Sequence, residues 1–121
     1  MTKRTKALSI SDSDRKEVYE RDSYDGAPCC VCCGSPRMIS VAHFIARSQG
    51  GLGIPENLVT LCLGCHSQYD HGRPEARQEI EWILEEYLQS KYPDWDRAKL
   101  TYQREGILGK ESDNEQNKSS A

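Results

Sequence analysis

Apolar residues in this chain fall into short groups, and their spacing predicts two strands followed by two helices. Residues 38–44 and 58–61 are apolar or β-prone, and they flank the glycine-rich polar segment ARSQGGLGIPEN. This arrangement predicts two strands joined by a long loop. We expect a helix to begin near Leu63 and to be interrupted at the sequence HGRP, where Pro74 suits the first position of a further helix.

The segment after Pro74 has apolar residues at three- and four-residue steps, which is typical of a helix with one buried face. These residues are Ile80, Ile83, Leu84, Tyr87 and Leu88. The sequence KYPDW ends the pattern. Nearer the N-terminus, Ser11 followed by Asp14 predicts the capped start of a short helix, whose thin apolar face holds Val18 and Tyr19.

Both ends of the chain contain little that could be buried. We expect residues 1–10, which are rich in basic side chains, to form a flexible arm. Residues 93–121 are expected to form an extended or disordered acidic tail, because the sequence GKESDNEQNKSSA lacks the apolar residues that would order it. The folded domain is therefore predicted over residues 11–92.

The chain of 121 residues, with 36% hydrophobic content, suits one domain with a small core. No apolar run approaches the roughly eighteen residues of a membrane helix, and no secretion signal is visible, so we expect a soluble intracellular protein. The net charge of −3 is unusual for a nucleic-acid-binding protein. However, the acidic excess gathers after residue 78, and residues 28–78 do not share it.

Six cysteines in an intracellular protein, arranged in two Cys-x-x-Cys pairs, indicate zinc binding in preference to disulfides. A structural zinc ion takes four ligands, and the second pair supplies Cys62 and Cys65. The candidates for the first pair are Cys29 with Cys32 or Cys30 with Cys33. We favour Cys30 and Cys33 because Gly34 follows them and allows the backbone to turn tightly.

His66 and Asp70 form a second candidate metal site. If Cys65 binds zinc, the side chain of His66 points about 100° further round the helix and is free. Asp70 lies four residues later on the same face, so the two could hold a divalent ion that keeps positions open for water and substrate oxygens. For the pair alone, the simpler interpretation is that His66 packs or caps and Asp70 is solvated.

Two further residues support the metal interpretation. His43 lies in the first predicted strand and Asn57 at the start of the second, so the two strands and the helix bring them near His66. A neutral imidazole can accept a proton from water, and an asparagine carbonyl can hold its other ring nitrogen in the required tautomer. A nucleophile, a base and a metal ion would then share one site.

The segments CVCCG, AHFIARSQGG, ENLVTLC and CHSQYD together resemble HNH endonucleases of the zinc-containing ββα-metal type, especially the small members found in phages and prophages. The resemblance covers about residues 18–72. It implies an α+β fold, namely a small treble-clef-like ββα-metal domain that is stapled by zinc and flanked by N- and C-terminal helices. It also implies hydrolysis of DNA phosphodiester bonds, by nicking or double-strand cleavage.

The resemblance assigns roles by motif position. His43 matches the general base, Asn57 the asparagine that orients it, and His66 a ligand of a catalytic ion, Mg²⁺ or another divalent metal. Asp70 lies where some members place a further metal-binding histidine. The ligands of the structural zinc ion would be Cys30, Cys33, Cys62 and Cys65. Arg47, in the loop after the first strand, is a candidate DNA phosphate contact.

One position departs from the family pattern. Many members have Asp or His just before the base, where this chain has Ala42. The departure fits either a non-catalytic zinc module that binds DNA or protein, or a nuclease in which Asp70 supplies the missing ligand, which we favour. His71 is a rival ligand, although its place on the helix is expected to turn it away from His66. The expected partners are DNA and phage packaging machinery such as a terminase, in the host cytoplasm if a phage encodes the protein.

Overall fold

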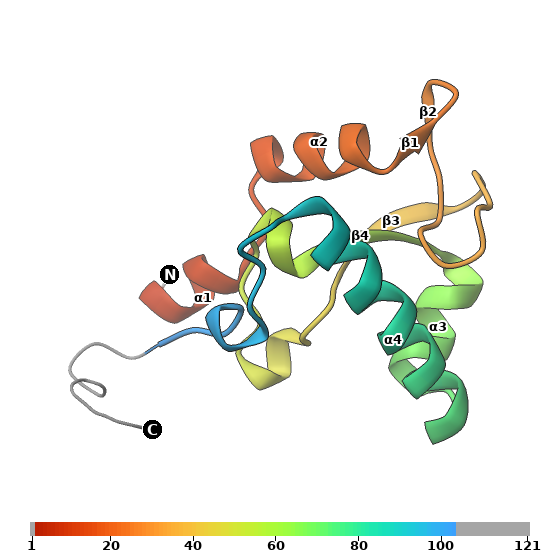
Figure 1. Ribbon diagram of the computed structural model, residues 1–121. Helices are drawn as coiled ribbons and strands as arrows, with labels where there is room; N and C mark the ends of the chain where they lie inside the picture. Colours follow the sequence, from red (N-terminus) through yellow and green to blue (C-terminus); the bar gives the residue numbers. More distant parts are fainter. Residues whose placement is uncertain (1, 104–121) are drawn as a thin grey trace.

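The computed structural model describes residues 2–103, which form an α+β domain with two small antiparallel hairpins (Figure 1). Its helices and strands are α1 (Lys3–Leu8), α2 (Asp12–Arg21), β1 (Ser23–Tyr24), β2 (Ala27–Pro28), β3 (Ile39–His43), β4 (Leu58–Cys62), α3 (Leu63–His71) and α4 (Pro74–Lys91). Short 3-10 helices are η1 (Arg47–Gln49), η2 (Pro55–Asn57) and η3 (Arg97–Lys99). No helix in this described part of the chain is both long and apolar enough to cross a membrane.

Strands β3 and β4 form an antiparallel hairpin, and α3 continues directly from β4 (Figure 1). In its register, His43 lies opposite Leu58 and Ile39 lies opposite Cys62. Cys62 both ends the strand and caps the helix, because its Sγ accepts a hydrogen bond of 3.4 Å from the N–H of Cys65. The prediction of two strands around a long loop, followed by a helix near Leu63, is confirmed.

The hairpin is covered by α4 on one side and by α2 on the other. The predicted apolar stripe of α4 buries Ile80, Leu84 and Leu88. They belong to a core cluster that also contains Cys30, Ala42, Phe44, Val59, Leu61 and Leu100. A smaller cluster joins Val18 of α2 to Val41 and Leu58. Complete burial of a leucine or valine side chain contributes roughly 1.5–3 kcal/mol, so these two clusters supply most of the apolar stabilisation.

The C-terminal segment folds back onto this core, so the prediction of an extended tail from residue 93 is wrong for residues 93–102. Trp95 packs edge-on against Phe44, with 5.8 Å between ring centroids, and its indole N–H donates to the carbonyl of Glu56. Leu100 is 2% exposed. These apolar side chains order a segment whose composition is otherwise polar. The rest of the tail prediction falls on residues 104–121, which lie outside the described residues.

The N-terminal segment also differs from the predicted flexible arm, because residues 3–8 form helix α1. Thr2 caps this helix by accepting a hydrogen bond from the N–H of Thr5. At the other end, Leu8 is only 3% exposed. The burial of Leu8 and the cap from Thr2 therefore order this segment as a helix, although its basic composition predicted a flexible arm.

A buried ion pair joins α2 to the hairpin and to α4. Arg21 donates to the carboxylate of Asp22 at 2.6 Å, and their side chains are 11% and 0% exposed. The same carboxylate accepts from the N–H and hydroxyl of Thr60 and from the hydroxyl of Tyr87. Burial works to lower the pKa of Arg21, but the hydrogen bond and charge of Asp22 outweigh it and leave that pKa above its usual value. Arg21 also donates to the backbone carbonyl of Leu58.

Replacing Asp22 with alanine should destabilise the domain severely, because Arg21 would stay buried without its counter-ion. We expect the free energy of unfolding of Asp22→Ala to fall by about 3–5 kcal/mol, measured by urea titration in buffer that contains zinc. Glu86→Ala, at an exposed position of α4, is the matched control and should change that free energy by less than about 0.5 kcal/mol. Equal urea midpoints for Asp22→Ala and the wild type would contradict this account.

Candidate functional site

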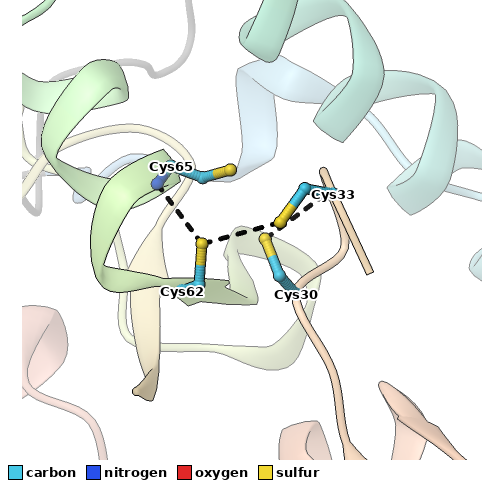
Figure 2. A group of neighbouring side chains, drawn as sticks. All are labelled: Cys30, Cys33, Cys62 and Cys65. Atoms are coloured by element: carbon cyan, nitrogen blue, oxygen red, sulfur yellow. Dashed lines mark hydrogen bonds between the residues drawn. The ribbon is translucent and has the colours of Figure 1, made fainter. Parts of the chain in front are cut away.

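Four cysteine side chains meet at the junction of β4 and α3 (Figure 2). Cys62 and Cys65 come from that junction, whereas Cys30 and Cys33 come from the loop after β2. All four Sγ atoms lie within 4.8 Å of one another, and those of Cys33 and Cys62 are 3.6 Å apart. The preference for Cys30 and Cys33 over the alternative pair is therefore supported by the arrangement of the side chains.

The cluster has the donor set and spacing of a tetrahedral metal site. Sulfur atoms that bind one zinc ion at about 2.3 Å lie roughly 3.8 Å apart, close to the spacing found here. Burial and the neighbouring thiols raise the pKa of Cys65, because four thiols this close cannot all ionise without a cation. The N–H groups of Cys33 and Cys65 point at the sulfur atoms of Cys30 and Cys62, as in metal-binding turns.

Gly34 makes the first turn possible. Its φ of +83° lies in the left-handed region, and its N–H donates to the carbonyl of Cys30 at 2.8 Å. The sequence argument for Cys30 and Cys33 depended on this glycine. Cys29, in contrast, directs its thiol at the backbone carbonyl of Ala27.

His66 and Asp70 lie one helical turn apart on α3 and face each other. The distance from Nε2 of His66 to Oδ2 of Asp70 is 3.2 Å, and the side chains are 32% and 49% exposed. The other ring nitrogen of His66 lies 3.4 Å from the hydroxyl of Ser40 on β3. Two ligands of one octahedral ion, each about 2.1 Å from it, lie roughly 3 Å apart, so this nitrogen–oxygen pair fits a divalent metal.

His43 is the last residue of β3, and one side of its ring is already bound. Its Nε2 lies 2.8 Å from the backbone carbonyl of Leu8 in α1. A carbonyl only accepts, so Nε2 carries the proton and Nδ1 of the neutral ring has a free lone pair. Burial lowers the pKa of His43, the hydrogen bond to Leu8 opposes this effect, and the positive charge of Arg47 adds to it. The ring is therefore neutral at physiological pH.

The side-chain hydrogen bonds of Asn57 go to the backbone of the loop between β3 and β4 and not to the ring of His43, unlike the contact that the sequence led us to expect. The side chain of Asn57 is completely buried, and Oδ1 accepts from the N–H of Ile45 at 2.8 Å. Its amide group donates to the carbonyls of Ile45 and Leu52. Asn57 therefore closes the long loop between β3 and β4. The ring of His43 is instead hydrogen-bonded to the carbonyl of Leu8, a residue that no motif in the sequence marked.

One cleft of about 730 Å³ contains the candidate catalytic residues other than Asn57. His43, His66 and Asp70 line it, together with the exposed Arg47. His71 lines the same cleft, and whether its side chain turns away from His66 stays a prediction. Ala42, by contrast, is 3% exposed and packs in the apolar core cluster.

Two arginines that the sequence did not single out also line the cleft. Arg77 lies in the first turns of α4, and Arg97 comes from the C-terminal segment. The guanidinium group of Arg97 lies 5.0 Å from the ring centroid of Phe44 and donates to Glu81 at 2.6 Å. No motif marks either residue, because both reach the cleft only through the packing of α4 and η3.

Comparisons with known proteins relate part of this chain to a known family. A family model described as HNH endonuclease matches residues 30–72, which contain the four clustered cysteines, both strands of the hairpin and α3. Over 58 residues the chain is 34% identical to "Anaredoxin" of Nostoc sp. (strain PCC 7120 / SAG 25.82 / UTEX 2576), a stretch that is 48% of this chain and 72% of that protein.

A solved structure described as "the Type IV phosphorothioation-dependent restriction endonuclease ScoMcrA" is similar, with a TM-score of 0.48 and 24% sequence identity. The similarity covers 67% of this chain but 16% of that chain, so this protein spans a small part of its length. The match to the family model and the similarity to the Nostoc relative give the family. This chain belongs to the HNH endonuclease family.

Proposed function

We propose that the protein is a metal-dependent endonuclease that hydrolyses phosphodiester bonds of DNA. The observation that carries the proposal is the cleft, in which a neutral His43 with a free Nδ1 lies on the same surface as the His66–Asp70 pair. Family membership supports DNA as the substrate.

In this proposal, Nδ1 of His43 takes a proton from the water molecule that attacks the phosphorus atom. The phosphorus–oxygen bond to the 3′ oxygen breaks, and the product carries a 5′ phosphate. The hydrogen bond from Nε2 to the carbonyl of Leu8 keeps the single ring proton on Nε2. The lone pair of Nδ1 therefore stays available to accept a proton. Asn57 acts indirectly, by holding the loop that follows His43.

His66 and Asp70 would hold the catalytic divalent ion, Mg²⁺ or a similar metal. When bound, this ion would act as a Lewis acid that stabilises negative charge on the phosphate and on the departing oxygen. The rest of its coordination shell would be open to water and phosphate oxygens, because only two protein ligands are proposed. Arg47, exposed at the cleft, would contact the DNA backbone, and Arg77 extends the same positively charged lining.

The four clustered cysteines would hold a structural zinc ion that joins the loop after β2 to the β4–α3 junction. The sequence also predicts association with phage packaging machinery and an intracellular location. Neither the contacts within residues 2–103 nor the comparisons bear on these two points, so both stay predictions.

One observation favours the alternative, a non-catalytic zinc module that binds DNA or protein. Ala42 occupies the position of a usual metal ligand and is buried in the core, so that position supplies no ligand. The two functions differ in a simple assay, since a binding module leaves supercoiled plasmid DNA intact in Mg²⁺, Mn²⁺ and Ni²⁺.

Replacing His43 with alanine should lower the rate of plasmid cleavage by about 10²-fold or more, because the general base is lost. The wild-type rate should rise with pH as His43 loses its proton and level off at a lower pH than for an ordinary histidine, because burial lowers the pKa of His43 below its ordinary value of 6.5. Gel quantification of nicked plasmid from pH 5 to pH 8 measures both effects. Equal zinc contents and melting temperatures show that the variant is folded. A His43→Ala variant that cleaves at the wild-type rate would exclude His43 as the base.

Replacing Asp70 with asparagine should raise the divalent-ion concentration needed for half-maximal cleavage by about 10- to 100-fold, because a charged metal ligand is lost. His71→Ala tests the rival ligand at the next position. If Asp70 is the ligand, titration with Mn²⁺ should give a large shift for Asp70→Asn and a small one for His71→Ala. The reverse order would assign the ion to His66 and His71.

Elemental analysis should find one zinc ion per chain. Cys33→Ser should lose this zinc, and its free energy of unfolding should fall by several kcal/mol, because metal binding contributes directly to folding. Cys29→Ser is a matched control in the same loop and should keep the zinc and the wild-type urea midpoint. Zinc loss from Cys29→Ser, with retention in Cys33→Ser, would contradict the ligand set.

A further inference from the structure

Helix α1 contacts the candidate active site although it lies outside residues 30–72, which match the family model. The contact is the 2.8 Å hydrogen bond between Nε2 of His43 and the carbonyl of Leu8. Leu8 is the last residue of α1, and the last carbonyl groups of a helix have no partner within the helix. This carbonyl is therefore free to accept a bond from another part of the chain.

A helix of six residues is not stable by itself, so the position of α1 is set by what it packs against. Its C-terminal end is held in two ways. The side chain of Leu8 is buried and only 3% exposed, and the N–H of Gly53 donates a hydrogen bond of 3.0 Å to the carbonyl of Ala7. Gly53 belongs to the long loop between β3 and β4, the same loop that Asn57 closes.

Gly53 leaves no room for a side chain at this contact. A Cβ atom at position 53 would lie 2.1 Å from the carbonyl oxygen of Ser9 and 3.0 Å from that of Leu8. Contacts of 2.1 Å do not occur between such atoms, so the backbone of Leu8 and Ser9 would have to move. The glycine thus permits the close approach that brings the carbonyl of Leu8 to His43.

We infer that α1 is a positioning element of the active site, in which the carbonyl of Leu8, held against Gly53, keeps His43 in the Nε2–H tautomer, so that Nδ1 is the ring nitrogen able to accept a proton. The inference rests on the proposed nuclease function. Leu8 does not touch the substrate and acts only through the imidazole ring. Without this contact, the imidazole ring of His43 could take several orientations and donate to water. A displacement of a catalytic group by about 1 Å can lower the reaction rate by about 10²-fold.

The test compares Gly53→Ala with Gly64→Ala, in the full-length protein. A Cβ atom at Gly64 meets nothing within 4 Å, so Gly64→Ala controls for the change of residue type. We expect Gly53→Ala to cleave plasmid DNA roughly 10- to 100-fold more slowly than wild type and Gly64→Ala to cleave at the wild-type rate. The zinc content of Gly53→Ala and its half-saturating Mn²⁺ concentration should stay at wild-type values, because neither metal site is changed.

Two measurements separate positioning from a general loss of stability. In the His43→Ala background, adding Gly53→Ala should not lower the residual cleavage rate further, since both changes act through one imidazole ring. Two-bond ¹H–¹⁵N spectra of the histidine rings, assigned with His43→Ala, should give the Nε2–H tautomer for His43 in the wild type. In Gly53→Ala they should give a mixture of tautomers.

If Gly53→Ala fails to fold, Ser9→Pro changes the same carbonyl from the other side. The φ of Ser9 is −78°, which proline adopts, but a proline at position 9 disfavours the helical conformation of Leu8 and turns its carbonyl away. The same rates and spectra are expected as for Gly53→Ala.

Three results would overturn the inference: wild-type cleavage by the folded variant, a further loss of rate in the His43→Ala background, or an Nδ1–H tautomer for His43 in the wild type. If the wild type itself does not cleave DNA, the proposed function fails. The ring spectra would still decide whether Leu8 holds His43, so the two failures can be told apart.

Discussion

Strand β4 and helix α3 share Cys62 without a connecting loop, and the geometry of the whole site depends on this junction. Because a helix turns by a constant angle per residue, the direction of β4 determines where His66 and Asp70 point. The four-cysteine cluster holds the junction against the turn of Cys30 and Cys33, which comes from a separate segment. A displacement at the junction would therefore move both proposed ligands of the catalytic ion together.

A domain built on a two-stranded hairpin has few apolar residues to bury, so polar contacts carry part of its stability. The carboxylate of Asp22 receives hydrogen bonds from α2, β4 and α4, and it does so without any contact with solvent. Together with the cysteine cluster, this ion pair ties α2, α4 and the loop after β2 to the hairpin. The first tie depends on charge, the second depends in the proposed function on metal binding, and both lie outside the cleft. The cleft can therefore keep its polar side chains exposed to a substrate.

Segments on both sides of the matched family region complete the site. From the N-terminal side, the carbonyl of Leu8 determines the proton position on His43. From the C-terminal side, Trp95 packs on Phe44, and Arg97 reaches the cleft beside the same ring. The buried methyl group of Ala42 offers no ligand at the position before His43, so in the proposed function the oxygen ligand is Asp70 of α3.

The features that could be predicted from the sequence depend on residues close together in the chain. The Cys-x-x-Cys turns, the cap of α2, the strand–loop–strand–helix order and the meeting of His66 with Asp70 all follow from local backbone geometry, which spacing and residue type determine. The bonds of Asn57, the contact between Leu8 and His43, and the return of Trp95 to the core could not be predicted in this way. Each joins atoms from separate elements, and several carbonyls and apolar surfaces could have served equally well. Only the packing of the whole chain brings one partner within bonding distance and excludes the others.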